Sequence, residues 1–295
     1  MLRLNRREFG SLALVGAAGL AASNRAAAHE GIHSIVRGVQ IGAQSYSFRD
    51  RSAEECAKAM HDIGLGECEL WSGHLERGPE GERRDREALR QWRLEAPLEE
   101  IEKVGKLFAD QGIEIYALNY SFREDFTDAE IERGFEFAKA LGAKALTASS
   151  NVSTAKRVDP YAKRYQMRVG MHNHSRIHEN EFATPEDFDK AMEGTSDYIA
   201  INLDIGHFVA AGFDPVDYLR RRHDDIVTLH IKDRKKDQGP NMPFGEGDTP
   251  IDAVLDLLRN EKYRIPANIE YEYDGDDTIA EVRRCFEYCK QALES

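Results

Sequence analysis

The sequence predicts a single α/β domain folded as a (β/α)8 TIM barrel, in which each of eight parallel strands is followed by a helix. Short apolar runs alternate with amphipathic stretches along almost the whole chain. The length of 295 residues suits this fold, which needs roughly 250. The sequence shows no long linker or composition break, and it lacks the glycine-rich phosphate loop that would follow the first strand of a doubly wound sheet, the main rival fold.

Eight apolar runs of strand length are expected to form the barrel wall. In chain order they cover residues 39–46, 67–71, 113–119, 143–148, 169–174, 199–205, 226–231 and 267–273. Each run is followed by a signal for a helix, so all eight strands are expected to run parallel.

Helix boundaries are marked by capping residues. Ser52 is expected to begin the first helix, which should end near Gly64, and Asp128 should begin another that Gly142 closes. Three later helices start with a proline after a capping residue, at 184–185, 214–215 and 249–250. Further helices are expected near 97–111, 158–166 and 277–293, whereas the polar stretch 75–93 is predicted to be a mobile loop.

Composition and charge exclude several classes of protein. Hydrophobic residues make up 41% of the chain, which is too many for a disordered protein. The net charge of −13 argues against a nucleic-acid partner, because phosphate binding needs clustered Lys and Arg. None of the four cysteines lies in a CxxC pair, and buried or free thiols are favoured over a bridge from Cys56 to Cys285 or Cys289.

The first 28 residues are predicted to be a twin-arginine signal peptide rather than part of the fold. The pair Arg6-Arg7 precedes an apolar run at 9–22, and the small residues 26–28 match a cleavage site. The run is too short for a membrane span, which needs roughly 20 apolar residues. Residues 29–295 would then form the mature domain, which would carry a charge of −16 and work in the periplasm or outside the cell without a membrane anchor.

Ionisable side chains gather where the strands end, which is where this barrel carries its catalytic groups. The strand ends include Glu69, Trp71, His74, His172, His174, Asp204, His207, His230, Lys232, Arg234, Glu270 and Glu272. Packing alone does not explain such a set, because unpaired ionisable groups are costly to bury. One divalent metal would offset that cost, and imidazole with carboxylate suits Mn, Zn, Co, Fe or Mg rather than Ca.

The segments 69–71, 172–174, 204–207, 230–233, 244–247 and 270–272 resemble those of the sugar phosphate isomerase/epimerase family, the xylose isomerase-like TIM barrels. The resemblance covers about residues 36–290. It implies a metal held by ligands from the fifth to the eighth strand: His172, Asp204, His230 and Glu272, with Glu270 as the alternative. His172 departs from the family pattern, in which an acid is common at that position.

The resemblance also implies roles for the neighbouring side chains. His207 matches the family's substrate-binding histidine, and Arg234, Glu69, Trp71 and His74 are the other expected substrate contacts. The candidate acid and base groups are Glu272, Glu270, His174 and Lys232, among which the sequence does not decide. Asp233 is expected to orient a neighbour rather than to bind metal.

These features predict an exported, divalent-metal-dependent isomerase or epimerase that moves a proton next to a sugar carbonyl through an enediolate. A related lyase or hydrolase-like enzyme acting on keto sugars or keto glycosides is the alternative. A non-catalytic sugar-binding barrel is a third hypothesis, and the acidic charge weighs against a fourth, an endonuclease. The substrate is expected to be a small carbohydrate, and a homo-oligomer is compatible with the sequence.

Overall fold

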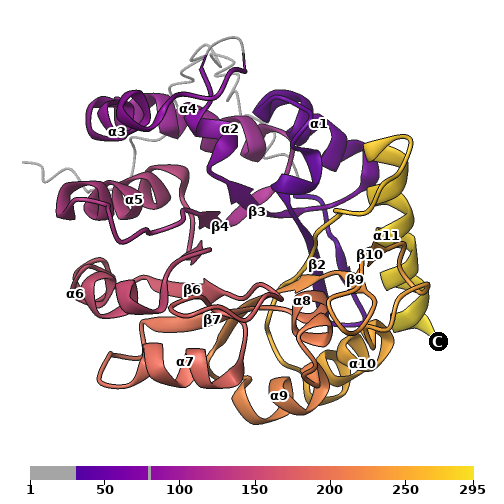
Figure 1. The fold of residues 1–295 in the computed structure, drawn as a ribbon. Coiled ribbons are helices and arrows are strands. Elements are labelled where there is room, and N and C mark those ends of the chain that lie inside the picture. The colour runs from indigo at the N-terminus through magenta and orange to yellow at the C-terminus, as the bar shows by residue number, and fades with distance from the viewer. Residues whose placement is uncertain (1–30, 79–80) are drawn as a thin grey trace, which may run out of the picture.

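A computed structural model describes residues 31–78 and 81–295 (Figure 1). The predicted signal peptide at 1–28 and the predicted start of the mature chain at residue 29 lie outside the described residues. Among the helices of the described ranges, none has the length and apolar character that crossing a membrane would require.

Eight parallel strands form a closed barrel, which confirms the predicted fold class. The sheet order is β2, β11, β8, β7, β6, β5, β4, β3, and pairing of β3 with β2 closes it. The strands are β2 (Val39–Gln44), β3 (Glu67–Trp71), β4 (Glu114–Asn119), β5 (Ala145–Ala148), β6 (Arg168–His172), β7 (Ile199–Asp204), β8 (Ile226–Ile231) and β11 (Ala267–Ile269). A short strand that the sequence did not predict, β1 (Ile35–Val36), pairs antiparallel with β2.

Helices surround the barrel and alternate with its strands (Figure 1). Those on the first half are α1 (Ala53–Ile63), α2 (Gly73–Glu76), α3 (Arg86–Glu95), α4 (Leu98–Asp110) and α5 (Asp128–Leu141). Those on the second half are α6 (Ala155–Tyr165), α7 (Pro185–Met192), α8 (Ile205–Ala210), α9 (Pro215–Arg222), α10 (Ile251–Glu261) and α11 (Thr278–Glu294). After the seventh barrel strand, β9 (Asp233–Arg234) and β10 (Asn241–Met242) form a small antiparallel ribbon.

The helix boundaries follow local capping chemistry. Ser52 accepts a hydrogen bond from the Glu55 amide and Glu55 returns one to Ser52, so α1 begins with a capping box. The helix ends at Gly64, whose φ of +96° is readily adopted only by glycine. The predicted starts of α7 and α9 are confirmed, with Pro185 and Pro215 in the first turn.

The stretch 75–93 is only partly the loop that the sequence analysis expected, because α2 extends to Glu76 and α3 begins at Arg86. Asp85 accepts a hydrogen bond from the Ala88 amide and so caps α3. Trp92 then anchors the helix against the apolar core, with its ring 5.6 Å from that of Phe137. Arg93 reaches back to Glu76 at 2.8 Å. From Arg86 onward, the polar composition that suggested a loop therefore belongs to the solvent-facing side of an amphipathic helix.

Two different kinds of packing make up the interior. Apolar side chains between strands and helices form the main core, in which the four cysteines are buried and unbridged. Inside the barrel, a small cluster of Ala117, Ala145, Ala200 and Val227 is separate from that core. Buried polar side chains take over toward the end where the strands finish: Gln44, Glu69, Thr147, Asn202, Thr228 and Asn268. This polar layer is hydrogen-bonded internally and supports the site above it.

Candidate active site and metal centre

A cavity of about 240 Å³ opens at the carboxyl ends of the barrel strands. Its wall includes His172, His174, His207, His230, Lys232, Glu270 and Glu272 on one side of the barrel, and Gln44, Tyr46, Trp71, Asn119, Ser121 and Ser149 on the other. Trp71, His174, His207, Lys232 and Glu272 are therefore at the cavity surface, where the sequence analysis placed them.

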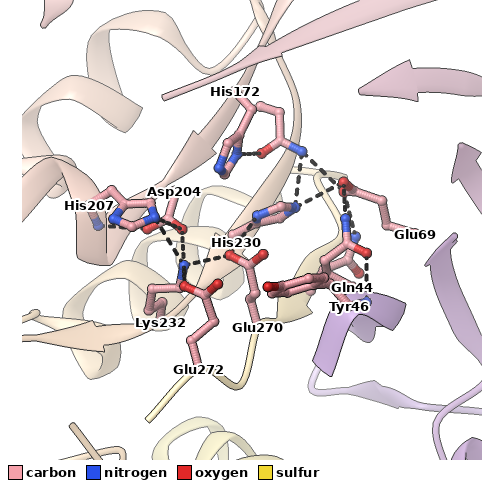
Figure 2. A network of polar contacts seen from close by, with 12 residues as sticks. Gln44, Tyr46, Glu69, His172, Asp204, His207, His230, Lys232, Glu270 and Glu272 are labelled. Carbon is pink, nitrogen blue, oxygen red and sulfur yellow. Dashed lines mark hydrogen bonds and ion pairs between the residues drawn. The ribbon is translucent and has the colours of Figure 1, made fainter. Parts of the chain in front are cut away.

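Four predicted or alternative ligands converge in this cavity: His172, Asp204, His230 and Glu270 (Figure 2). One ligand atom from each lies within 4.8 Å of all the others, and all four residues are buried. The glutamate in this cluster is Glu270, the alternative, and not Glu272, our first choice. The reason is local: β11 ends at Ile269, so Glu270 is directly beside β8, while Glu272 lies further out and is 24% exposed.

The donor set fits a divalent cation. The buried Oδ2 atom of Asp204 accepts no hydrogen bond and is paired in charge with the Lys232 ammonium at 3.0 Å, so a cation can share this oxygen as a ligand. Two imidazoles with two carboxylates are the mixed nitrogen and oxygen ligands that transition metals prefer. The four residues come from four consecutive barrel strands or their ends, so the backbone fixes their spacing.

Hydrogen bonds to the far ring nitrogens orient both histidines. The Nδ1 atom of His172 is 3.1 Å from the Asn202 side-chain oxygen, an arrangement in which Nδ1 donates and Nε2 keeps its lone pair. In His230 the two nitrogens exchange these roles. Its Nε2 atom lies 3.0 Å from the supporting carboxylate of Glu69, and its Nδ1 atom faces the ligand cluster, 3.1 Å from Glu270. This is how protein metal sites usually hold their imidazole ligands.

Glu69 lies beneath the cavity and is not the substrate contact that the sequence analysis expected. It is fully buried and accepts hydrogen bonds from Gln44, Thr147 and Asn202 in addition to its contact with His230. Burial opposes ionisation of Glu69, but the charge of His230 and these hydrogen bonds hold its pKa below the usual value. A carboxylate in this position orients His230 and makes it a better ligand.

Replacing Glu69→Gln should therefore weaken divalent-metal binding by roughly 10–100-fold, the usual cost of losing such a partner. The amide has no negative charge and turns an NH₂ group toward donors. Titration calorimetry with MnCl₂ measures the change. Glu67→Gln is a matched control two residues earlier on β3, because the Glu67 carboxylate makes no hydrogen bond to His230. Equal metal affinity in Glu69→Gln and wild type would contradict the assigned role.

Lys232 is the centre of a buried ionic cluster. Its Nζ atom lies 3.0 Å from Asp204, 2.7 Å from Glu270 and 2.6 Å from Glu272 (Figure 2). Burial alone would lower the pKa of this amine, but the three carboxylates outweigh burial and raise it, so Lys232 is an ammonium ion. It ties the metal-ligand carboxylates to Glu272, the acid that lies nearer to solvent.

His207 lies between two cations. Its Nε2 atom is 3.1 Å from Lys232 Nζ, and its Nδ1 atom is 2.7 Å from an Arg234 nitrogen. Burial, followed by the charge of Lys232, holds the pKa of His207 well below its usual value, so the ring is neutral. Arg234 itself is not at the cavity surface. It supports His207 from behind and also binds Ser175 and the Gly239 carbonyl.

Trp71 and Tyr46 form an aromatic wall on the opposite side, with ring centroids 5.1 Å apart. His74 does not reach the cavity. It packs edge-on against Trp71 at 5.5 Å and its Nε2 atom lies 3.1 Å from the Ser45 carbonyl oxygen. The sequence-predicted role of His74 as a substrate contact is thus replaced by one of supporting Trp71.

The neutral histidines predict an acid-sensitive fold. Burial lowers the pKa of His74 to about 4, although its contact with the Ser45 carbonyl works in the other direction. In the unfolded chain a histidine has a pKa near ~6.5, so between pH ~6.5 and ~4 only the unfolded chain takes up the proton. The contribution of His74 to the free energy of unfolding is therefore fully present above that window and is lost as the pH falls through it.

We expect the fold to lose on the order of 2 kcal/mol for this ring between pH ~7 and ~5. Urea unfolding at several pH values measures the change, and His74→Gln should show a correspondingly shallower pH dependence. The matched substitution His33→Gln, outside this wall, is the control for replacing a histidine by glutamine elsewhere in the chain. Identical pH profiles for His74→Gln and wild type would contradict the prediction.

The sequence analysis missed the neutral polar residues of the cavity. Gln44, Asn119, Ser121 and Ser149 stand at or just beyond the ends of the first, third and fourth barrel strands, and Tyr46 follows the first. The rule that selected the charged residues, position at a strand end, applies equally to these five. They escaped notice because neutral amides and hydroxyls are common in turns.

The fold and the cavity together define a TIM barrel with a candidate metal centre at the carboxyl ends of its strands. A family model described as xylose isomerase-like TIM barrel matches residues 84–291, and the chain belongs to this family.

Two curated relatives match parts of the chain. One is the inosose dehydratase of Clostridium tetani, 30% identical over 131 residues, which are 38% of this chain and 43% of that protein. The other is the L-ribulose-5-phosphate 3-epimerase UlaE of Escherichia coli, 31% identical over 91 residues, which are 30% of this chain and 32% of that protein. The chain thus matches less than half the length of either relative.

Solved structures resemble the whole barrel at low identity. The 3-keto-D-glucoside 4-epimerase of E. coli superposes with a TM-score of 0.65 at 16% identity, covering 86% of this chain and 99% of that one. A D-tagatose 3-epimerase-like protein gives a TM-score of 0.65 at 16% identity, covering 87% and 97%. At this identity the likeness supports the fold.

Proposed function

We propose that the protein is a divalent-metal-dependent sugar isomerase or epimerase that moves a proton next to a carbonyl. The observation that carries this proposal is the convergence of four possible metal ligands on one cavity: His172, Asp204, His230 and Glu270. The same cavity is lined by other ionisable side chains that do not belong to the ligand set. Sugar epimerases among the relatives and structural neighbours support the same class. A bound divalent cation would polarise the substrate carbonyl and so acidify the neighbouring C–H bond.

Glu272 is the best-placed group for the proton transfer. It lines the cavity, is partly exposed, and is held by Lys232 at 2.6 Å rather than by the ligand cluster. His174 also lines the cavity, packed against His172 with ring centroids 5.1 Å apart. Burial and the neighbouring His172 lower the pKa of His174 to about 4, so it is neutral and can accept a proton. An epimerase removes a proton from one face of a carbon and returns one to the other face, and Glu272 and His174 are the two candidate groups for these steps.

Exchange of substrate hydrogen with D₂O tests the proposal directly. Metal-loaded enzyme is incubated with ketoses and keto glycosides, and their terminal phosphates, and deuterium uptake is followed by NMR. We expect uptake at the carbon beside the carbonyl, and a loss of roughly 10²–10⁴-fold in Glu272→Gln. Elemental analysis should find about one transition metal per chain. Ligand binding without any exchange would identify a non-catalytic sugar-binding barrel instead.

A lyase is the second candidate, and the similarity to an inosose dehydratase favours it specifically. The same proton abstraction would eliminate a leaving group if one stood β to the carbonyl, and Lys232 or His174 could protonate that group. The exchange experiment separates the two reactions, because elimination releases water or an aglycone whereas isomerisation keeps the carbon and oxygen count of the sugar.

The proposal includes export through the twin-arginine route, which rests on the sequence of residues 1–28 alone. Fractionation of cells producing the full chain should place the mature enzyme outside the cytoplasm. Arg6→Lys with Arg7→Lys should retain it inside, and export of that double variant would contradict the proposal.

A further inference from the structure

We propose that this cavity takes an uncharged carbohydrate rather than a sugar phosphate. The inference rests on the proposed function, because it concerns the substrate of the same site, and it restricts the substrate class. TIM barrels that bind phosphate commonly do so with the loops after the seventh and eighth strands and a nearby helix N-terminus. In this chain the structure and charge of both loops disfavour the binding of a phosphate.

The loop after the seventh strand is closed by its own carboxylate. Asp233, in β9 directly after β8, is buried and accepts hydrogen bonds from the amides of Gly245 at 2.8 Å, Gly247 at 2.9 Å and Thr249 at 3.2 Å. Converging backbone amides of this kind are what a phosphate would require. A Cβ atom on Gly247 would lie 1.9 Å from the Asp233 carboxylate, so the loop is fitted tightly around that group.

The loop after the eighth strand is acidic. Residues 270–277 contain five acids and no Lys or Arg. The helix that follows, α11, is capped by Asp277, whose side chain accepts a hydrogen bond from the Ala280 amide at 2.7 Å. The helix N-terminus that could have received a phosphate therefore already carries a carboxylate, and the surrounding negative charge would repel a second anion.

The cations near the cavity are already engaged. Among the described residues, the cavity surface has one basic side chain of the lysine or arginine type, Lys232. Three carboxylates surround its ammonium group within 3.0 Å. Arg234 directs its nitrogens to the Gly239 carbonyl, Ser175 and His207. The side chains of Asp204, Glu270, Glu272 and Lys232 carry a summed charge of −2, and one bound divalent cation brings this sum to zero. The site therefore offers no surplus positive charge to a phosphate dianion.

The opposite half of the cavity suits a neutral sugar. Asn119, Ser121 and Ser149 supply uncharged hydrogen-bonding groups that match hydroxyls, and Tyr46 and Trp71 supply an apolar surface for C–H groups. Arg49 and Arg77 lie over the Tyr46 and Trp71 rings at 5.0 and 5.1 Å, and both also donate hydrogen bonds to backbone carbonyls.

Among the described residues, a groove beside the cavity lined by Arg176, His178, Arg234 and Gln238 is another place where a phosphate could bind. Arg176 and His178 are exposed there, so water and salt compete with any anion they contact. The buried groups of this chain therefore favour a neutral substrate, and the exposed groove supplies the alternative that the experiment must address.

The test compares matched pairs: D-fructose with D-fructose 6-phosphate, L-ribulose with L-ribulose 5-phosphate, and methyl 3-keto-glucoside with its 6-phosphate. Deuterium uptake from D₂O gives kcat/KM for each, and quenching of tryptophan fluorescence gives binding, with Trp71→Phe assigning the signal. We expect at least one uncharged probe to exchange at least 10-fold more efficiently than its phosphate. Arg176→Gln should leave that exchange unchanged.

A phosphate ester that exchanges as well as, or better than, its uncharged partner would overturn this proposal while leaving the proposed function intact. Loss of that phosphate exchange in Arg176→Gln would then assign the phosphate to the groove. The absence of exchange with all six probes would overturn the proposed function, and this proposal with it.

Discussion

Asp204→Asn should lower the affinity for a divalent metal by more than about 100-fold, beyond the 10–100-fold cost of losing a group that only orients a ligand. Asp204 supplies a buried oxygen to the ligand cluster, and the amide that replaces it carries no charge and binds metal weakly. Turnover should fall with metal occupancy. Calorimetric titration with MnCl₂ and elemental analysis after dialysis measure the effect.

The substitution should preserve the fold around Asp204. Asp204 also begins α8, where its side chain accepts a hydrogen bond from the His207 amide at 2.6 Å, and asparagine can cap a helix equally well. Asp214→Asn is the matched control, because Asp214 caps the neighbouring helix α9 and does not face the cavity. Full metal occupancy in Asp204→Asn, with a folded protein, would reject the ligand set.

Lys232→Met should destabilise the metal-free protein by about 3–5 kcal/mol, the usual cost of leaving buried charges without their partner. The ammonium ion is 2% exposed and is shared by Asp204, Glu270 and Glu272. Without it, three carboxylates repel one another in a buried space. A divalent cation on Asp204 and Glu270 would relieve much of that repulsion, so the variant should gain more stability from added metal than wild type does.

Urea unfolding with and without MnCl₂ measures both halves of this prediction. Lys106→Met is the control, since Lys106 pairs with Asp110 on the surface of α4 and such exposed pairs contribute roughly 0–1 kcal/mol. If Lys232→Met were as stable as wild type in the absence of metal, the ammonium ion could not be what holds the three carboxylates together.

The sequence was sufficient for the architecture because capping and periodicity are local. Ser52 with Gly64, and Pro215 after Asp214, marked the ends of helices that the structure confirms. Helix α3 was missed because the contact that stabilises it is not local. Its stability depends on Trp92 packing against a helix some 40 residues further on, and neighbouring residues carry no sign of that contact.

Residue roles were harder to predict than residue positions. The strand-end rule found the cavity, but depth within the barrel is a three-dimensional quantity. Glu69 and Trp71 lie two residues apart on one strand and share a face, yet Glu69 is buried under His230 while Trp71 borders the cavity. The choice between Glu270 and Glu272 likewise depended on where β11 stops pairing with β8, which the apolar pattern of 267–273 did not reveal.

The two sides of the cavity come from two consecutive parts of the chain. The ionic cluster is drawn from β6 to the end of β11, whereas the neutral wall comes from β2 to the end of β5. Because the groups that would do the chemistry and those that would recognise the sugar come from separate parts of the chain, a point mutation at Ser121 or Ser149 can change which hydroxyls are accepted without touching the ligands. Glu69 and its partners Gln44 and Thr147 are the exception in this part of the chain, because they hold the ligand His230. Such a barrel can diversify its substrates along a lineage while keeping one reaction.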